Sequence, residues 1–346
     1  MFTTNRRDFL RSTSATAAGV ALGLPALPTT ASAQVPTLLF GTTNPPQIPV
    51  NSQIMHPWAK TINEQGKGVI AIDVRDGPTL ANFMNYYDRV IADAVQISWG
   101  IQTYIAGKFV GSLAPCLPFT SDKAEHASVA YWRLLKSGLL DSEYSDLEPL
   151  FVCVFSQATL HTRRPLDKVD ELGNLKITTG SKIAGDVVAQ LGGSSVSLPL
   201  SDYYEALQRG TVDGVVTPWT AILPFKLNEV LRYHVESPLG SNVGVLFMSK
   251  KKFAELPAAA KKVLTDNSGE AQSRRFGAFW DSEQERGRAA VRAMPGHTLV
   301  DLKPDEESRM RNRLQAVRDS WTKATPNGAK ILETYEKLLA DVHAGK

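Results

Sequence analysis

Apolar and polar residues follow one another in the first half of this chain in the order expected for strands joined by helices. Apolar runs and alternating positions predict strands at residues 37–42, 69–74 and 92–98. Apolar residues at helical spacing predict one helix at 53–65 and another around 81–91. This succession favours a twisted, largely parallel sheet with helices on its faces.

The same order of elements returns in the second half of the chain. Strands are predicted at 175–179, 196–200 and 212–218, with helices at 181–191 and 201–210 between them. Ser201 is expected to cap the second of these helices, because a serine hydroxyl can accept a hydrogen bond from the first turn. Two lobes of similar construction are therefore predicted.

Two apolar stretches are long enough to connect the lobes, at residues 151–157 and 242–249. Residues 258–294 contain few helix breakers, which predicts one long helix spanning both lobes. We expect an α/β fold in which lobe I comprises residues 35–155 plus 243–280, and lobe II residues 156–242 plus 281–346. A chain of this length also favours two lobes over one core.

The amino terminus has the pattern of an export signal. Arg6 and Arg7 precede an apolar stretch at 15–27, and the small residues at 31–33 suit a signal peptidase. We expect residues 1–33 to be a cleaved twin-arginine signal peptide and the protein to be periplasmic. An uncleaved membrane anchor is the alternative, but the apolar stretch is shorter than the roughly 20 residues that cross a bilayer.

Composition argues against a nucleic-acid partner but does not decide whether the two cysteines form a disulfide. The formal net charge is +3, and removal of the signal brings it close to neutral, so no nucleic-acid partner is expected. Cys116 and Cys153 both lie in apolar stretches. Two buried thiols are favoured over a disulfide, although a periplasmic location permits either.

The residues of common catalytic sites are not arranged as catalysis requires. The histidines at 56, 126, 161, 234, 297 and 343 form no close pair of the kind that binds zinc within one helix. No serine-hydrolase elbow or glycine-rich nucleotide loop occurs. We therefore expect no enzyme activity, catalytic residue, metal or cofactor; His161 is interpreted as structural, and Asp93 and Asp213 as turn caps.

Several segments in a fixed order resemble a known receptor family. These are residues 172–178, residues 191–214 with the sequence LGGSSVSLPLSDYYEALQRGTVDG, and the dipeptide Thr217-Pro218. Together they resemble the extracytoplasmic solute receptors of tripartite ATP-independent periplasmic (TRAP) transporters, of the DctP type. The resemblance covers nearly the whole chain after the signal.

This resemblance implies a monomeric clamp like the type II periplasmic binding proteins. It would close on a small organic solute, an organic acid or weakly polar compound, and deliver it to the small and large membrane subunits of a TRAP transporter. A receptor that serves a sensor kinase is the alternative, and an exported hydrolase is a more remote one.

The resemblance also implies ligand contacts, with one departure from the family pattern. Thr178 stands where the family usually has an arginine that binds the ligand carboxylate, so a simple dicarboxylate is not expected. Either Arg163 or Arg164 takes over this role, or the ligand is neutral or largely apolar. At least one of these two arginines is otherwise a surface charge.

The resemblance implies further ligand contacts by matching position, several of them at the ends of the predicted strands. Asn44 follows the first strand, although it can also be a turn residue. Tyr203 and Trp219 would offer aromatic faces, and Trp99 is either a ligand contact or a core residue. The remaining expected contacts are Gln96, Ser98, Leu200 and Thr217.

Overall fold

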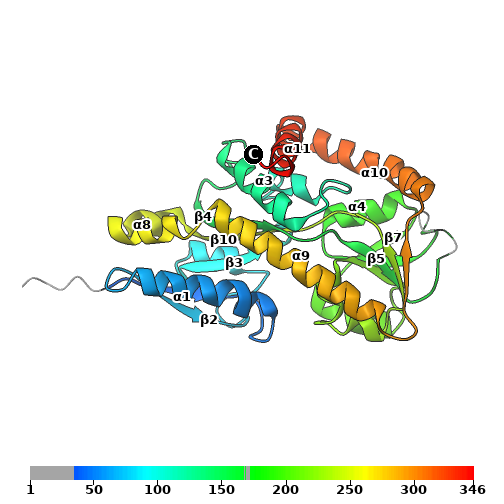
Figure 1. The fold of residues 1–346 in the computed structure, drawn as a ribbon, viewed down its shortest axis with the longest axis horizontal. Helices are drawn as coiled ribbons and strands as arrows, with labels where there is room; N and C mark the ends of the chain where they lie inside the picture. Colours follow the sequence, from blue (N-terminus) through cyan, green and yellow to red (C-terminus); the bar gives the residue numbers. More distant parts are fainter. Residues whose placement is uncertain (1–34, 167, 169–171) are drawn as a thin grey trace, which may run out of the picture. The chain divides into compact units, whose positions relative to one another are not determined.

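The computed structural model describes residues 35–166, 168 and 172–346. Residues Val35–Lys346 form one compact unit, which Figure 1 shows as a ribbon. The predicted signal peptide at 1–33 lies outside the described residues. Among those residues, the helices are too short or too polar to traverse a lipid bilayer.

The first sheet, called sheet A, is five-stranded and has the order β2-β1-β3-β10-β4. The strand β1 is parallel to β2 and β3, whereas β10 is antiparallel to both β3 and β4. Its strands are β1 Thr37–Gly41, β2 Ala71–Arg75, β3 Ile97–Ile101, β4 Leu147–Val154 and β10 Val243–Ser249.

The second sheet, called sheet B, is six-stranded and has the order β11-β9-β5-β8-β6-β7. Parallel pairs join β6 to β7 and to β8, and β5 is antiparallel to both of its neighbours. Its strands are β5 Thr159–Thr162, β6 Lys176–Thr179, β7 Ser194–Ser197, β8 Gly214–Thr217, β9 Tyr233–Glu236 and β11 Thr298–Asp301.

Helices cover the two sheets, as the strand–helix alternation predicts, so the α/β fold class is confirmed. Short 3-10 helices lie at Gln102–Tyr104, Gly111–Cys116, Leu200–Asp202 and Leu227–Glu229, and a π-helical turn at Asn51–Met55 precedes α1. The helices are α1 His56–Gln65, α2 Tyr86–Ile91, α3 Ala124–Lys136, α4 Lys182–Gln190, α5 Tyr203–Gln208, α6 Trp219–Ile222, α7 Lys250–Glu255, α8 Ala258–Asp266, α9 Glu270–Arg292, α10 Pro304–Ala324 and α11 Gly328–His343.

Two segments carry the chain between the sheets, and we call residues 155–158 and 237–242 the crossing segments. The first leads from β4 to β5 and the second from β9 to β10. They are hydrogen-bonded to each other, since the Phe155 N–H donates to the Asn242 carbonyl at 2.8 Å and the Ala158 N–H to the Gly240 carbonyl at 2.7 Å. The first segment overlaps the connection predicted at 151–157, whereas the second lies just before the one predicted at 242–249, most of which is β10 of sheet A.

The long helix predicted at 258–294 is two helices, because α8 ends at Asp266 and α9 begins at Glu270. Gly269 has a φ of +87° at the break, a conformation that a helix cannot contain. Helix α9 lies beside α3 (Figure 1) and packs against both α3 and α6. Its aromatic residues belong to the core of sheet A and Val291 to the core of sheet B.

Glycines allow α9 to approach its two neighbours at backbone distance. A Cβ atom at Gly277 would collide with the Ala124 carbonyl at the start of α3. A Cβ atom at Gly287 would lie 2.7 Å from the carbonyl oxygen of Trp219, at the start of α6. Helical glycines are each unfavourable by roughly 1 kcal/mol relative to alanine, so these two positions depend on close packing.

Some local predictions need correction. Ser201 does not cap a helix, because its hydroxyl bonds to Asp202 and α5 begins only at Tyr203 without a side-chain cap. Ser181 is a true cap, since its Oγ accepts from the Ala184 N–H at 3.2 Å. The strand predicted at 92–98 is β3, displaced to Ile97–Ile101.

Both cysteines are buried and neither forms a disulfide, which confirms the expectation of two buried thiols. Burial raises the pKa of the Cys116 thiol above its ordinary value and that of Cys153 to about 12. Both thiols are therefore protonated and unreactive at neutral pH.

Candidate functional site

Buried polar groups without partners mark the region where strands of both sheets end. Four such groups are the hydroxyls of Thr43 and Thr178, the amide Nδ2 of Asn44 and the indole Nε1 of Trp99; none has a hydrogen-bond partner among the described residues. The four side chains are at most 7% exposed. We call these four residues the donor cluster.

Three of the four residues of the donor cluster lie at or just after the carboxyl ends of strands. Thr43 and Asn44 follow β1, and Thr178 lies near the carboxyl end of β6. Because β1 is parallel to β3, the carboxyl ends of these two strands share one edge of sheet A. Loops at the carboxyl ends of parallel strands are the usual place for ligand sites in α/β folds.

Two tyrosines from different sheets meet next to the donor cluster. Tyr104 comes from the 3-10 helix after β3 and Tyr203 begins α5. A Cβ atom at Gly180 would lie 3.4 Å from the Tyr203 hydroxyl and 3.7 Å from the Tyr104 hydroxyl. The absence of a side chain at Gly180 therefore leaves room for both phenols.

Both phenols are neutral hydrogen-bond donors at neutral pH. Burial raises the pKa of Tyr104. Burial also raises the pKa of Tyr203, the nearby Tyr104 adds to the rise, and the Thr178 hydroxyl opposes it. Thr178 is thus close to Tyr203, although the two hydroxyls do not form a hydrogen bond of normal geometry.

Aromatic rings connect this tyrosine pair to Trp99. The ring of Phe83 packs edge-on against both Tyr104 and Trp99, each at 5.9 Å between centroids. Trp99 in turn stacks on Phe155 of the first crossing segment, at 6.5 Å. The region therefore combines apolar ring faces with several hydrogen-bond donors.

The chemistry of the donor cluster favours an anionic ligand group. The amide Nδ2 of Asn44 and the indole Nε1 of Trp99 can only donate, and the two threonine hydroxyls can also donate. A buried donor without an acceptor is unfavourable by about 1–3 kcal/mol. A carboxylate, which only accepts, would satisfy these groups without any cation from the protein.

The two arginines expected to hold a carboxylate lie at the edge of sheet B away from Thr178 and Thr217, which argues against the predicted role. Because β5 is antiparallel to β8, Thr159 lies opposite Thr217 while Thr162 lies opposite Gly214. The chain therefore reaches Arg163 at the amino end of β8, where its N–H donates to the Asp213 carbonyl. Arg164 follows and is exposed.

We expect Arg163→Ala and Arg164→Ala to leave the affinity for an acidic ligand within about twofold, equivalent to about 0.4 kcal/mol. The reason is their position at the edge of sheet B away from Thr178 and Thr217. Isothermal titration of the purified variants would measure this. A loss of tenfold or more in either variant would return the arginines to the ligand site.

Gln96 and Ser98 are engaged in hydrogen bonds within the protein, which also argues against their predicted ligand role. Gln96 precedes β3, and its Oε1 accepts from the Leu39 N–H at 2.9 Å. Its Nε2 donates to Asp93. Ser98 donates its hydroxyl proton to the Gly41 carbonyl at 2.8 Å.

Other expected contacts lie at the ends of the sheet B strands. Thr217 is at the carboxyl end of β8 and is 6% exposed. Leu200 follows β7 and packs, half-buried, against the cluster that contains Tyr203. Trp219 is a core residue in this structure, because it is 1% exposed and its Nε1 donates to Glu236 at 3.3 Å.

Three histidines form a hydrogen-bonded chain behind Trp219. His161 Nδ1 lies 2.8 Å from His234 Nδ1, and His234 Nε2 lies 3.0 Å from His297 Nδ1. His161 Nε2 faces the Thr217 carbonyl at 3.1 Å and the Thr159 hydroxyl at 2.8 Å. The Trp219 ring packs on His161 and His234, with centroids 4.7 and 4.9 Å away.

The chain of contacts fixes the tautomers of these histidines. A carbonyl only accepts, so His161 Nε2 carries the proton and His161 Nδ1 accepts from His234. His234 Nε2 then accepts from His297 Nδ1. Burial lowers the pKa of His161 to about 3, and burial together with the neighbouring histidines and Arg232 lowers that of His234 to about 2.

Comparison with known proteins identifies the family. Residues 40–324 match the family model DctP, described as bacterial extracellular solute-binding protein, family 7. The chain belongs to this family. The predicted membership of the TRAP solute-binding receptors is thereby confirmed.

Relatives of this family 7 protein cover most of its length. It is 25% identical to the "outer membrane transporter protein TsaT" of Comamonas testosteroni over 91% of this chain and 95% of that one. A TRAP solute-binding protein of Rhodoferax ferrireducens, solved with copurified benzoate, is 25% identical with a TM-score of 0.80, covering 88% of this chain and 98% of that one.

A second solved structure shares the fold at lower identity. It is a TRAP solute-binding protein of Bordetella bronchiseptica with bound mandelate, 23% identical with a TM-score of 0.80 over 88% of this chain and 99% of that one. The two-lobed α/β fold expected from the sequence is therefore confirmed for this family 7 protein.

Three residues in the candidate site of this family 7 protein were not expected from the sequence. These are Thr43, Phe83 and Tyr104. Thr43 directly precedes Asn44, so the strand-end argument already covered its position. Tyr104 follows β3 by three residues and would have been expected if the strand had been extended to Ile101.

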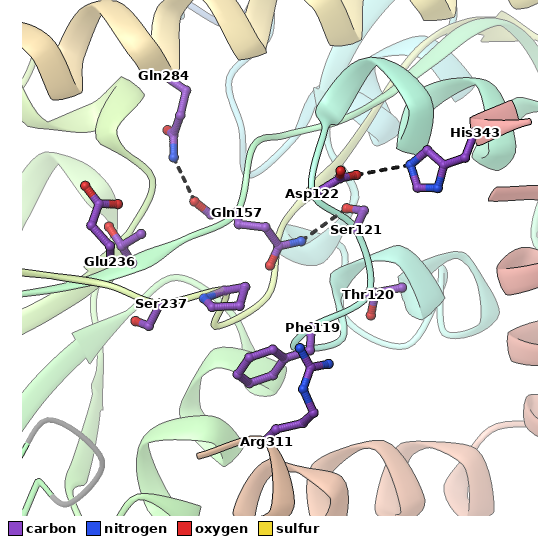
Figure 2. Close-up of a pocket in the computed structure, with 12 residues that line it drawn as sticks. Phe119, Thr120, Ser121, Asp122, Gln157, Glu236, Ser237, Gln284, Arg311 and His343 are labelled. Carbon is purple, nitrogen blue, oxygen red and sulfur yellow. Dashed lines mark hydrogen bonds and ion pairs between the residues drawn. The ribbon is translucent and has the colours of Figure 1, made fainter. Parts of the chain in front are cut away.

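A pocket of about 450 Å³ lies at the crossing segments (Figure 2). Gln157, Ser237 and Pro238 of these segments line it, and the residues of the donor cluster do not. The donor cluster is our candidate for the solute site, because its four polar groups lack partners and Thr178 is close to the Tyr104–Tyr203 pair.

Proposed function

We propose that this protein captures an aromatic monocarboxylic acid in the periplasm and delivers it to the small and large membrane subunits of a TRAP transporter. The observation that carries this proposal is the donor cluster, four buried donor groups without acceptors beside a series of aromatic rings. The ligand would lie between lobe I, residues 35–155 plus 243–280, and lobe II, residues 156–242 plus 281–346. Export would depend on the signal peptide at 1–33.

The carboxylate would be held by neutral donors. Thr178 replaces the arginine that the family resemblance implies, and the arginines at 163 and 164 lie at the far edge of sheet B. Hydrogen bonds from neutral groups to a carboxylate are each worth about 1.5–3 kcal/mol. Several of them can hold one carboxylate, whereas a second carboxylate would be buried without a cation.

The aromatic part of the ligand would pack against the rings of the site. Phe83, Tyr104 and Tyr203 offer apolar faces next to Thr178, and edge-to-face pairs add about 0.5–1.5 kcal/mol beyond area burial. The benzoate found with the Rhodoferax ferrireducens relative supports this ligand class. Closure of the two lobes about the crossing segments would then shield the ligand from water.

A ligand panel tests this function. Thermal unfolding of the purified mature protein should shift upward with benzoate or mandelate, because a ligand that binds only the folded state stabilises it by about 2.7 kcal/mol at one hundred times its dissociation constant. Succinate and malate should give no shift. The ligand should be recovered unmodified after denaturation.

Two outcomes would contradict the proposal. A large shift with succinate would show that two carboxylates are accommodated. Recovery of a modified compound would indicate an enzyme. If deletion of the gene abolishes uptake of the bound acid, the protein is a transport receptor and not a receptor for a sensor kinase.

A further inference from the structure

Three side chains that can bind a metal meet where the start of α3 packs against the end of α11. Asp122, His126 and His343 each bring one ligand atom to within 4.8 Å of the others. Asp122 lies two residues before the start of α3, and His126 lies in the first turn of that helix. His343 is the last residue of α11, which packs against α3.

The protein's own contacts leave this group incompletely bonded. His343 Nε2 lies 3.1 Å from Asp122 Oδ1, and the rings of His126 and His343 are 4.7 Å apart at an angle of 72°. Nδ1 of His126 is buried and has no hydrogen-bond partner among the described residues. The imidazole of His126 is therefore not held by the surrounding network.

The group is open to solvent on one side. The side chains of Asp122 and His343 are 70% and 39% exposed, which gives a metal ion access from solvent.

Figure 2 shows Asp122 and His343 turned toward each other at one side of the pocket. Both line this pocket of about 450 Å³, together with Gln157, Gln284 and Arg311. A metal ion held by Asp122 and His343 would therefore have one coordination position directed to a space that can hold water. This open position resembles that of three-ligand zinc sites.

We propose that Asp122, His126 and His343 form a binding site for one divalent transition-metal ion of the Zn²⁺ type, with a water molecule as the fourth ligand. Two imidazoles and one carboxylate are a ligand set that suits Zn²⁺, Co²⁺ and Ni²⁺ and not Ca²⁺ or Mg²⁺. The sequence does not indicate this metal site, because His126 and His343 belong to different helices.

The three ligand atoms are already close to the spacing of a metal site. Bonds of about 2.0–2.2 Å place tetrahedral ligands roughly 3.4 Å apart, compared with the upper limit of 4.8 Å between the ligand atoms here. Asp122 precedes α3 and His343 ends α11, so neither lies in a helix interior. We expect rotation of these two side chains to close the remaining distance.

The bound metal would link the carboxyl-terminal helix to α3. Helix α11 also packs against α10, and α10 packs against α4 beside sheet B. The metal would therefore fix the end of a helical series that runs from sheet B to α3. The expected consequence is a higher unfolding temperature with metal present.

The test uses untagged mature protein freed of metal with a chelator. Titration calorimetry with ZnCl₂ should show one ion per chain, and Co²⁺ should give visible absorption of a tetrahedral site. His343→Asn and His126→Asn should each weaken binding at least about 100-fold, the loss expected when one of three protein ligands is removed. His56→Asn, a histidine paired with Asp76 elsewhere on the surface, is the matched control and should bind as the parent does.

Two results would overturn the proposal. One is no binding of Zn²⁺ or Co²⁺ by the parent protein. The other is undiminished binding by both His343→Asn and His126→Asn, which would place the metal elsewhere. Circular dichroism of each variant checks that the fold is retained.

Discussion

Acidification from pH 7.5 to 5.0 is expected to lower the free energy of unfolding by about 4 kcal/mol through two buried histidines. His161 and His234 are 0% exposed, and their pKa values in the folded protein are lowered to about 3 and 2. In the unfolded chain a histidine has a pKa near 6.5. Between pH 6.5 and about 3 the unfolded state therefore binds more protons than the folded state.

The sign and size of the pH effect on the free energy of unfolding follow from this difference in bound protons. Stability rises with pH wherever the unfolded state binds more protons, so it falls as the pH is lowered below 6.5. At pH 5.0 protonation favours the unfolded state by about 2 kcal/mol for each histidine. Two such histidines remove a large part of an ordinary stability of 5–15 kcal/mol.

The groups around the three hydrogen-bonded histidines disfavour their protonation in the folded protein. Arg232 disfavours a positive charge on His234 and on His297. The nearby carboxylate of Glu236 is held by Arg288 at 2.6 Å and is therefore already neutralised. Protonation of His234 at Nε2 would also break the hydrogen bond that this atom accepts from His297 Nδ1.

Urea unfolding at several pH values would measure the effect. Burial raises the pKa of Asp281 and Glu148, which acts in the opposite direction, so the comparison with His161→Gln and His234→Gln is decisive. In each variant, the decrease in the free energy of unfolding between pH 7.5 and 5.0 should be roughly half of that in the parent protein. Imidazole NMR signals assigned to His161 or His234 that titrate near pH 6.5 in the folded protein would contradict the prediction.

The variant Thr178→Val is expected to stabilise the empty protein and to weaken ligand binding. Its hydroxyl is buried without a partner, so an isosteric methyl removes a cost of about 1 kcal/mol in the absence of ligand. The same change removes one donor to the ligand carboxylate, worth about 1.5–3 kcal/mol, or about 10- to 100-fold in affinity.

Thr179→Val is the matched control on the same strand. The Thr179 hydroxyl is satisfied, since it lies 3.0 Å from Ser195 Oγ. This variant should therefore be destabilised by about 1 kcal/mol and keep the parent affinity. Thermal unfolding and calorimetric titration with benzoate measure both quantities, and an unchanged affinity of Thr178→Val would remove Thr178 from the ligand site.

Local patterns in the sequence predicted the elements of the fold well, because periodicity depends on neighbouring residues. These local patterns could not predict where β3 begins and ends. Asp93 has a φ of +55°, which turns the chain before the strand, and Gln96 bonds to Leu39 across the sheet. That bond joins residues far apart in sequence, so no local pattern indicates it.

The residues of the candidate site were partly predicted. Asn44 follows from the end of the first strand, and the family resemblance pointed to Thr178 and to Tyr203. The position of Arg163 could not be predicted, because it depends on the direction of β5, which is antiparallel to β8. Strand direction within a sheet is a tertiary property and is not encoded in alternation of apolar residues.

The two glycines of α9 restrict how the lobes can move. Gly277 contacts the backbone of α3 and Gly287 the backbone of α6, about 15 Å apart along the helix. A helix engaged at backbone distance at both points cannot slide along its own axis, because side chains of the next turn would collide. We therefore expect sheets A and B not to shear past one another, so that opening proceeds by bending α9 between these points or by lifting it from one of them.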